Sequence, residues 1–125
     1  MSHFVTIRTQ IKDIPALMLA CMELGLLLIQ NNEARGYGKR WTPGDYVIKL
    51  KGPYDIALNK QPDGTYGMTT DWWDGHVEKE VGKDFGRLLQ LYGAYKAAAE
   101  AKRKGYLVQR HAMKDGSIKL VIQGV

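Results

Sequence analysis

The segment Gln61-Pro62-Asp63-Gly64 constrains the fold of this chain more than any other short stretch. Proline fixes the φ angle that the second position of a tight turn requires, and glycine accepts the positive φ that closes such a turn. Residues 54–59 and 65–72 flank it as runs of strand length. The chain therefore contains an antiparallel hairpin, and a sheet is expected around it.

A second turn signal, Asp115-Gly116, separates residues 107–113 from residues 117–123 and predicts another hairpin. Near the N-terminus, residues 5–11 alternate between apolar and polar side chains, which is typical of a half-buried strand. Two further strands are expected, a buried one over residues 26–29 and an alternating one over residues 45–51. A glycine-rich polar loop, with room for a short strand, is expected over residues 31–43.

The first expected helix begins after Asp13, a residue that caps helix N-termini, and Pro15 is tolerated in its first turn. Gly25 provides the left-handed conformation that commonly follows the last turn of a helix. Apolar residues recur between them at helical spacing and predict one buried stripe. This stripe consists of Ile14, Leu17, Met18, Cys21 and Leu24.

A second, longer helix is expected to begin near Phe85 and to end before Gly105. Cations in its last turn complement the negative end of the helix dipole, so the basic run of residues 102–104 requires no ligand to explain it. The predicted apolar face of this helix consists of Phe85, Leu88, Leu89, Tyr92, Tyr95 and Ala99.

Together these elements predict a single α+β domain over residues 1–125, with the order β-α-β-β-β-β-α-β-β. A chain of 125 residues is long enough to bury one core without help. Each helix has one apolar stripe, so we expect both helices on one face of a mostly antiparallel sheet. No internal repeat or linker indicates a second domain.

Composition excludes several classes of protein. The hydrophobic fraction of 45% and the charged fraction of 25% are those of a folded globular protein. No apolar run approaches the ~20 residues of a membrane span, and the first residues do not resemble a secretory signal. The single cysteine, Cys21, fits a reducing compartment, so we expect a cytoplasmic protein or one in an organelle stroma.

The formal net charge of +5 is compatible with an anionic partner such as nucleic acid. Lysine and arginine are spread from Arg8 to Lys119, and a solvated basic surface explains this distribution more simply.

No metal site or cofactor is expected. The three histidines and Cys21 do not occur in pairs with the spacing of metal ligands. Cys21 belongs to the apolar stripe of the first helix, where a thiol behaves as a small apolar side chain. The glycines of residues 36–40 do not follow the pattern of a phosphate-binding loop, and no serine lies in a nucleophile motif.

Trp72 and Trp73 are adjacent at the end of the predicted hairpin arm, so we expect them to point to opposite faces of a strand. One would enter the core, and the other would be exposed or cover a sheet edge; an exposed tryptophan here favours a protein interface over chemistry. An alternative is an acid/base cluster of Asp71, Asp74 and His76, but residues 74–76 are more simply interpreted as a turn.

Several segments in order carry a family resemblance. They are "MSHFVTIRTQIKD", "RGYGKRWTPGDYVI", "YDIALNKQPDGTYGMTTDWW" and "GYLVQRHAMKDGSIKLVIQG". Nearly end to end, the chain resembles a family of small conserved proteins of unknown function found in cyanobacteria, in algal plastid genomes and in various bacteria. The family has no established reaction, so the resemblance supplies no catalytic residues, and it supports the expectation of a single intracellular domain.

We therefore expect a protein-interaction module or subunit without catalytic activity, which binds a protein partner through exposed aromatic residues and a sheet edge. The expected contact residues are Tyr37, Trp41, Trp72 and Trp73, and self-association into a homo-oligomer is compatible with them. The alternative is a nucleic-acid or anion-binding protein, in which Arg35, Lys39 and Arg40 act beside Tyr37 and Trp41.

Overall fold

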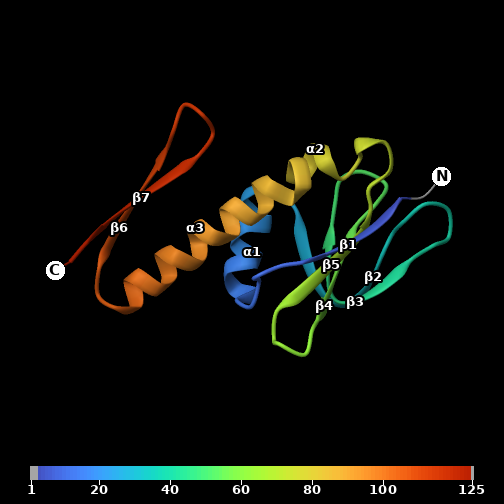
Figure 1. Ribbon diagram of the computed structural model, residues 1–125, viewed down its shortest axis with the longest axis horizontal. Helices are drawn as coiled ribbons and strands as arrows, with labels where there is room; N and C mark the ends of the chain where they lie inside the picture. Colours follow the sequence, from blue (N-terminus) through green and yellow to red (C-terminus); the bar gives the residue numbers. More distant parts are fainter. Residues whose placement is uncertain (1–2, 125) are drawn as a thin grey trace.

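The computed structural model describes residues 3–124, and it confirms the α+β class and the predicted order of the main elements (Figure 1). The helices are α1 Ile14–Glu23, the one-turn α2 Glu78–Val81 and the long α3 Gly86–Arg103. The strands are β1 Phe4–Arg8, β2 Leu27–Ala34, β3 Thr42–Lys49, β4 Ile56–Lys60, β5 Tyr66–Asp71, β6 Leu107–Ala112 and β7 Ile118–Gln123.

The strands form two sheets, and every pairing among the described residues is antiparallel. The larger sheet has the strand order β1-β5-β4-β3-β2, so β1 and β2 are its edge strands. The smaller sheet is the β6–β7 hairpin alone. This hairpin packs on α3 at the far end of the molecule from the larger sheet (Figure 1).

The β4–β5 hairpin confirms the turn predicted at residues 61–64. The Gln61 amide donates to the Thr65 carbonyl at 2.8 Å, and the Gly64 amide donates to the Gln61 carbonyl at 2.9 Å. Gly64 has a φ of 88°, which is the left-handed conformation that the turn requires. Met68 and Leu58 face each other across this hairpin and are both fully buried in the core.

β2 differs from its prediction as a buried strand over residues 26–29. It runs for eight residues along the edge of the sheet, and Leu27 is 60% exposed. The prediction overestimated burial because an apolar run indicates a strand that is covered on both faces, whereas the side chain of Leu27 lies on a face that is not covered. Since β2 extends to Ala34 and β3 begins at Thr42, the predicted loop over residues 31–43 is reduced to residues 35–41.

The end of the β2–β3 hairpin folds over the face of the sheet that the helices leave uncovered. Val47 and Ala57 are partners across β3 and β4 and point away from the main core, yet both are fully buried. Ala34 packs against them, and just beyond it the Arg35 carbonyl accepts a hydrogen bond from the Asp55 amide at 2.9 Å. This places residues 35–41 beside the start of β1 (Figure 1).

Helix α1 has the predicted caps. The Asp13 carboxylate accepts a hydrogen bond from the Ala16 amide at 3.1 Å, and Gly25 follows the helix with a φ of 75°. The prediction that Met18 is buried is wrong, because its side chain is 45% exposed. The helix packs against both α3 and the start of β2, so its buried face is made of the residues Ala16, Leu17, Ala20 and Cys21.

The chain between β5 and α3 is compact and irregular. It contains two single-turn 3₁₀ helices, at Trp73–Gly75 and Lys83–Phe85, on either side of α2. Asp74 and Gly75 have φ angles of 57° and 70°, so the chain turns here, as was predicted for residues 74–76. Val77, Val81 and Phe85 are buried and fix this segment to the core.

Helix α3 ends at Arg103, and Gly105 follows it with a φ of 83°, as predicted. Leu88, Leu91 and Tyr92 are its buried side chains on the core side. The predicted members Leu89 and Tyr95 are half-buried and pack against the same core.

Candidate functional site

The candidate site is the loop of residues 35–41, which we call the aromatic loop. Tyr37 is 48% exposed and Trp41 is 52% exposed. Lys39 and Arg40 are exposed between them. Two hydrogen bonds stabilise the turn from within, because the Arg40 amide donates to the Tyr37 carbonyl at 3.2 Å and the Trp41 amide donates to the Lys39 carbonyl at 3.1 Å.

Arg35, at the start of the aromatic loop, is bound to Asp55. The Arg35 Nε donates to Asp55 Oδ2 and Nη2 donates to Oδ1, both at 2.8 Å. Nη2 also donates to the carbonyls of Leu50 and Gly52, at 3.0 and 2.8 Å. Lys49 Nζ lies 3.3 Å from Asp55 Oδ2. Arg35, which was predicted to bind an anion, is therefore already paired with the Asp55 carboxylate of the protein itself.

The Asp55 side chain is fully buried, but its charge is well compensated. Besides the Arg35 guanidinium, it accepts hydrogen bonds from the backbone amides of Arg35 at 2.9 Å and Leu50 at 3.0 Å. Burial raises the pKa of Asp55, but these hydrogen bonds outweigh burial, so its pKa lies below the ordinary value. The carboxylate is thus charged at neutral pH and acts as a structural anchor.

Asp71 is a second buried carboxylate that holds the aromatic loop. Its Oδ2 accepts a hydrogen bond from the Tyr37 amide at 3.1 Å. Its Oδ1 accepts from the amides of His3, at 3.0 Å, and Trp73, at 3.1 Å. One carboxylate therefore joins the N-terminal segment, the aromatic loop and the chain that leaves β5.

The two carboxylates are neighbours in the sheet. Ile56 of β4 is paired with Thr70 of β5, so Asp55 and Asp71 occupy the next opposite positions in the same register. The hydroxyl of Thr70 donates to the backbone carbonyl of Asp55 at 2.7 Å and so links the two strands beside the two carboxylates. The aromatic loop lies over both carboxylates and is anchored at two points.

The tryptophans Trp72 and Trp73 lie beyond β5, which ends at Asp71, so the prediction that they occupy opposite faces of a strand is wrong. Both are half-buried and pack against the main core. The Trp72 ring packs at a tilt against Phe85, with 4.8 Å between the ring centroids. The Trp73 and His3 rings form a T-shaped pair with 5.4 Å between centroids, and Asp71 accepts hydrogen bonds from the amides of both Trp73 and Tyr37 of the aromatic loop.

The residues considered for acid/base chemistry do not converge. Asp71 is buried under backbone amides, whereas the Asp74 side chain is 72% exposed. His76 Nε2 lies 3.8 Å from Asp74 Oδ2, and the His76 ring packs edge-on against Tyr54. Within residues 3–124, no group of three acidic, histidine or cysteine side chains is arranged to hold a metal ion.

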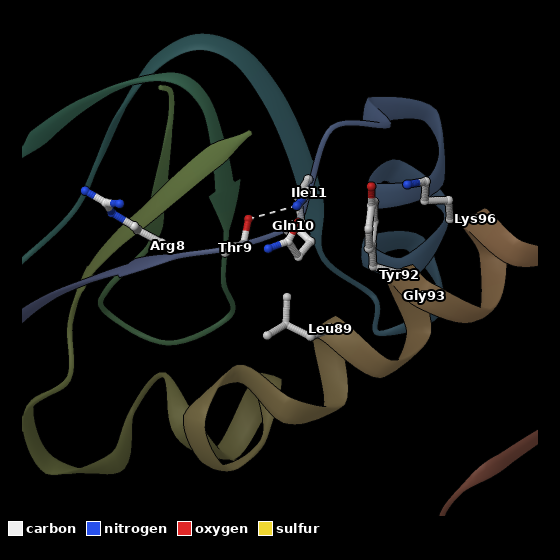
Figure 2. A pocket seen from close by; sticks show the side chains of 8 residues that line it. All are labelled: Arg8, Thr9, Gln10, Ile11, Leu89, Tyr92, Gly93 and Lys96. Atoms are coloured by element: carbon white, nitrogen blue, oxygen red, sulfur yellow. Dashed lines mark hydrogen bonds between the residues drawn. The ribbon is translucent and has the colours of Figure 1, made fainter. Parts of the chain in front are cut away.

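A groove of about 490 Å³ lies between the β1–α1 connection and α3 (Figure 2). Ile11, Leu89 and Tyr92 form its apolar part, and Figure 2 shows Arg8 extending away from them. The Tyr92 hydroxyl accepts hydrogen bonds from the amides of Lys12 and Asp13, so it fixes the start of α1. The Tyr92 hydroxyl in this groove thus serves the fold.

Sequence reasoning missed the structural role of Asp55 and Asp71. The sequence did contain one signal. Asp55 comes just before β4 and Asp71 is the last residue of β5, and the turn at residues 61–64 fixes a register in which these two positions are opposite each other. Charged residues at such positions are buried only when they are paired. The partner, the start of the aromatic loop, is remote in sequence and could not be identified from spacing.

These features define a small α+β protein in which two buried carboxylates fix an exposed aromatic loop over an antiparallel sheet. The model of a family described as "protein of unknown function (DUF1257)" matches residues 20–121, and the chain belongs to this family. It is similar to the uncharacterized protein ycf35 of Pyropia yezoensis, with 33% identity over 98% of this chain and 97% of that protein. The predicted family resemblance is thus confirmed.

No solved structure matches the chain significantly. Across residues 3–124, none of the helices has the length and apolar character needed to cross a membrane.

Proposed function

We propose that this protein is a non-catalytic interaction module that binds a protein partner through the aromatic loop. The observation that carries the proposal is the exposure of two large aromatic side chains, Tyr37 and Trp41, on a loop that buried carboxylates hold in place. Tyrosine, tryptophan and arginine are the residues enriched at the energetic centres of protein interfaces. Arg40 is next to Trp41 in the sequence, so the loop also contains an exposed arginine.

The anchored backbone supports binding because it reduces the entropy that is lost on association. A loop that is ordered before the partner arrives does not have to be ordered by the partner. Arg35 and Tyr37 fix the first half of the aromatic loop to Asp55 and Asp71.

The proposed contact surface extends to the start of β1. Phe4 is 39% exposed, and a side chain at Gly36 would lie 3.0 Å from the Phe4 ring, so the loop and the edge strand are in close contact. Trp73 adjoins the same region through Asp71, whereas Trp72 packs on Phe85 and serves the core. A partner could therefore contact the aromatic loop and the β1 edge together, by the strand addition that exposed sheet edges permit.

The alternative of nucleic-acid or anion binding by the aromatic loop has less support. The Arg35 guanidinium is engaged by Asp55, which leaves Lys39 and Arg40 as the cations of the loop that face solvent.

Affinity capture from native lysate tests the proposal with three forms of the full chain: wild type, Tyr37→Ala/Trp41→Ala, and the control Met22→Ala/Leu27→Ala. The control removes side chains that are 64% and 60% exposed and lie outside the loop. Loss of about 2 kcal/mol at one interface centre corresponds to roughly thirtyfold weaker binding. A protein retained by wild type and control but lost from the loop variant supports the proposal, and equal capture by all three contradicts it.

A further inference from the structure

The positive charge of the chain is concentrated in one part of the molecule. Residues 1–95 hold eleven lysines and arginines and eleven aspartates and glutamates, so they are formally neutral. Residues 96–125 hold seven cations and two anions, which accounts for the whole net charge of +5. These residues form the end of α3 and the β6–β7 hairpin, which we call the basic arm. The basic arm projects away from the larger sheet (Figure 1).

Few of these cations are paired within residues 3–124. Lys96 lies 3.9 Å from Glu100, and Arg110 binds Glu23. The remaining acidic residue, Asp115, accepts hydrogen bonds from the amide and hydroxyl of Ser117 in the hairpin turn. The other five cations are exposed and form no ion pair with the described residues. They are Lys102, Arg103, Lys104, Lys114 and Lys119.

The hairpin of the basic arm has two different faces. Val108 and Leu120 lie toward α3, where they line a small cavity of about 160 Å³ with its alanines. The opposite face is mostly polar, and His111 and Lys119 are cross-strand partners on it. This outward face consists of Leu107, Gln109, His111, Lys119, Val121 and Gln123, and it carries no acidic residue.

The hairpin is also held in a fixed orientation. Arg110 Nη1 and Nη2 donate to the two oxygens of Glu23, each at 2.7 Å, and the Tyr95 hydroxyl donates to Glu23 Oε1 at 2.7 Å. Near the turn, Gln90 Nε2 donates to the Gly116 carbonyl at 3.2 Å. The polar face is therefore presented as a stable ribbon rather than as a loose arm.

We propose that the basic arm is a binding surface for double-stranded DNA, with the β6–β7 ribbon in the major groove and the end of α3 on the phosphate backbone. Two paired strands lie about 4.8 Å apart, and with side chains such a ribbon fits the roughly 12 Å width of that groove. Glutamine, histidine and lysine side chains on the outward face provide hydrogen-bonding groups for base edges and phosphates. This site is separate from the aromatic loop and does not depend on the proposed function.

Other polyanions fit the basic arm less well. Single-stranded nucleic acid is typically bound by stacking on aromatic side chains, and the outward face of the ribbon has no phenylalanine, tyrosine or tryptophan. The major groove of duplex RNA is deep and too narrow for side chains to read. An anionic membrane would favour an apolar outward face, whereas this one is mostly polar.

Fluorescence anisotropy with a labelled DNA duplex of about two helical turns tests the proposal, at about 50 and 200 mM salt. The variant Lys102→Gln/Arg103→Gln/Lys104→Gln should lose at least about tenfold in affinity at low salt, and its salt dependence should be shallower by about three in the log–log slope. The matched control Lys12→Gln/Lys60→Gln/Lys83→Gln removes three exposed cations outside the basic arm and should bind nearly as wild type does.

Several results would overturn this assignment. They are no binding of wild type at low salt, equal losses in the two triple variants, or no loss in the ribbon variant Lys114→Gln/Lys119→Gln. Tighter binding to single-stranded DNA, duplex RNA or phosphatidylserine vesicles than to duplex DNA would also reject it. Circular dichroism of each variant, which should match wild type, separates lost binding from lost folding.

Discussion

Arg35 and Asp55 are bound to each other in both directions. The Arg35 side chain and amide donate to the Asp55 carboxylate, and the Asp55 amide donates to the Arg35 carbonyl at 2.9 Å. The pair closes the end of the β2–β3 hairpin over the sheet and buries Val47 and Ala57 beneath it. The exposed aromatic loop therefore depends on an ion pair whose carboxylate has no contact with solvent.

Replacement of Asp55 should destabilise the protein severely. Asp55→Ala leaves the buried Leu50 amide and the amide and guanidinium of Arg35 without their acceptor, and each buried donor left unpaired costs about 1–3 kcal/mol. Urea denaturation measures the loss, with Glu100→Ala as a control that removes an exposed carboxylate at a cost within about 0.5 kcal/mol. The double variant Arg35→Met/Asp55→Ala should recover part of the loss, and strictly additive effects of the two substitutions would contradict the pairing.

The sequence predicted the features that depend on neighbouring residues. The turn at residues 61–64, the Asp13 cap and the Gly105 cap were each correct because local backbone chemistry determines them. The predicted burial of the residues of β2 and of Met18 was wrong because burial depends on which element lies opposite. No local pattern in the sequence indicates which element will pack against a given residue.

Contacts between distant segments explain what the sequence did not reveal about the candidate site. Tyr37 and Trp41 are exposed, which their expected role in binding requires. The guanidinium of Arg35, however, is already paired with Asp55, twenty positions away in the sequence. Similarly, the helix dipole accounts for the cations of residues 102–104 in the sequence, but only the fold shows that they lie on the same arm as the cations of the β6–β7 hairpin.

The Glu23–Arg110 anchor should weaken in acid. The hydrogen bond from Arg110, and then that from Tyr95, lowers the pKa of Glu23 from 4.5 to about 2. Because the pKa is lower in the folded state, the stabilising contribution of Glu23 is complete above about pH 4.5 and is lost as the pH falls toward 2. Carboxyl ¹³C NMR of Glu23 measures this titration. Arg110→Met should return the pKa toward its ordinary value, and an unchanged midpoint would exclude the anchor.

Cys21 should be unreactive in the folded protein. Burial raises the pKa of its thiol to about 12, and the thiolate is the reactive form. At pH 8 a thiol-specific reagent should modify Cys21 only when the chain opens, so the labelling rate should rise sharply across the denaturation midpoint. Rapid stoichiometric labelling without denaturant would show that α1 does not protect this side chain.

The three tryptophans should differ in solvent access. Trp41 is 52% exposed, whereas Trp72 and Trp73 are half-buried. Acrylamide quenching of the intrinsic fluorescence should therefore decrease more in the variant Trp41→Phe than in Trp72→Phe or Trp73→Phe. Trp72→Ala should cost about 2–3 kcal/mol because it removes the contact with Phe85, whereas Trp41→Ala should change stability by less than about 0.5 kcal/mol. Equal destabilisation by the two alanine substitutions would contradict this packing.

Two glycine substitutions should have opposite effects on stability. An added Cβ at Gly44 would lie 2.5 Å from the Tyr46 carbonyl oxygen and 3.2 Å from the Ala57 Cβ, where the strands pack too closely to yield. Gly44→Ala should cost about 2 kcal/mol or more through this overlap. Gly93 lies in α3 with no atom within 4 Å of an added Cβ, so Gly93→Ala should stabilise the helix by about 0.5–1 kcal/mol. Thermal denaturation measures both, and a stabilised Gly44→Ala would show that the β2–β3 hairpin does not fold over the sheet as closely as described.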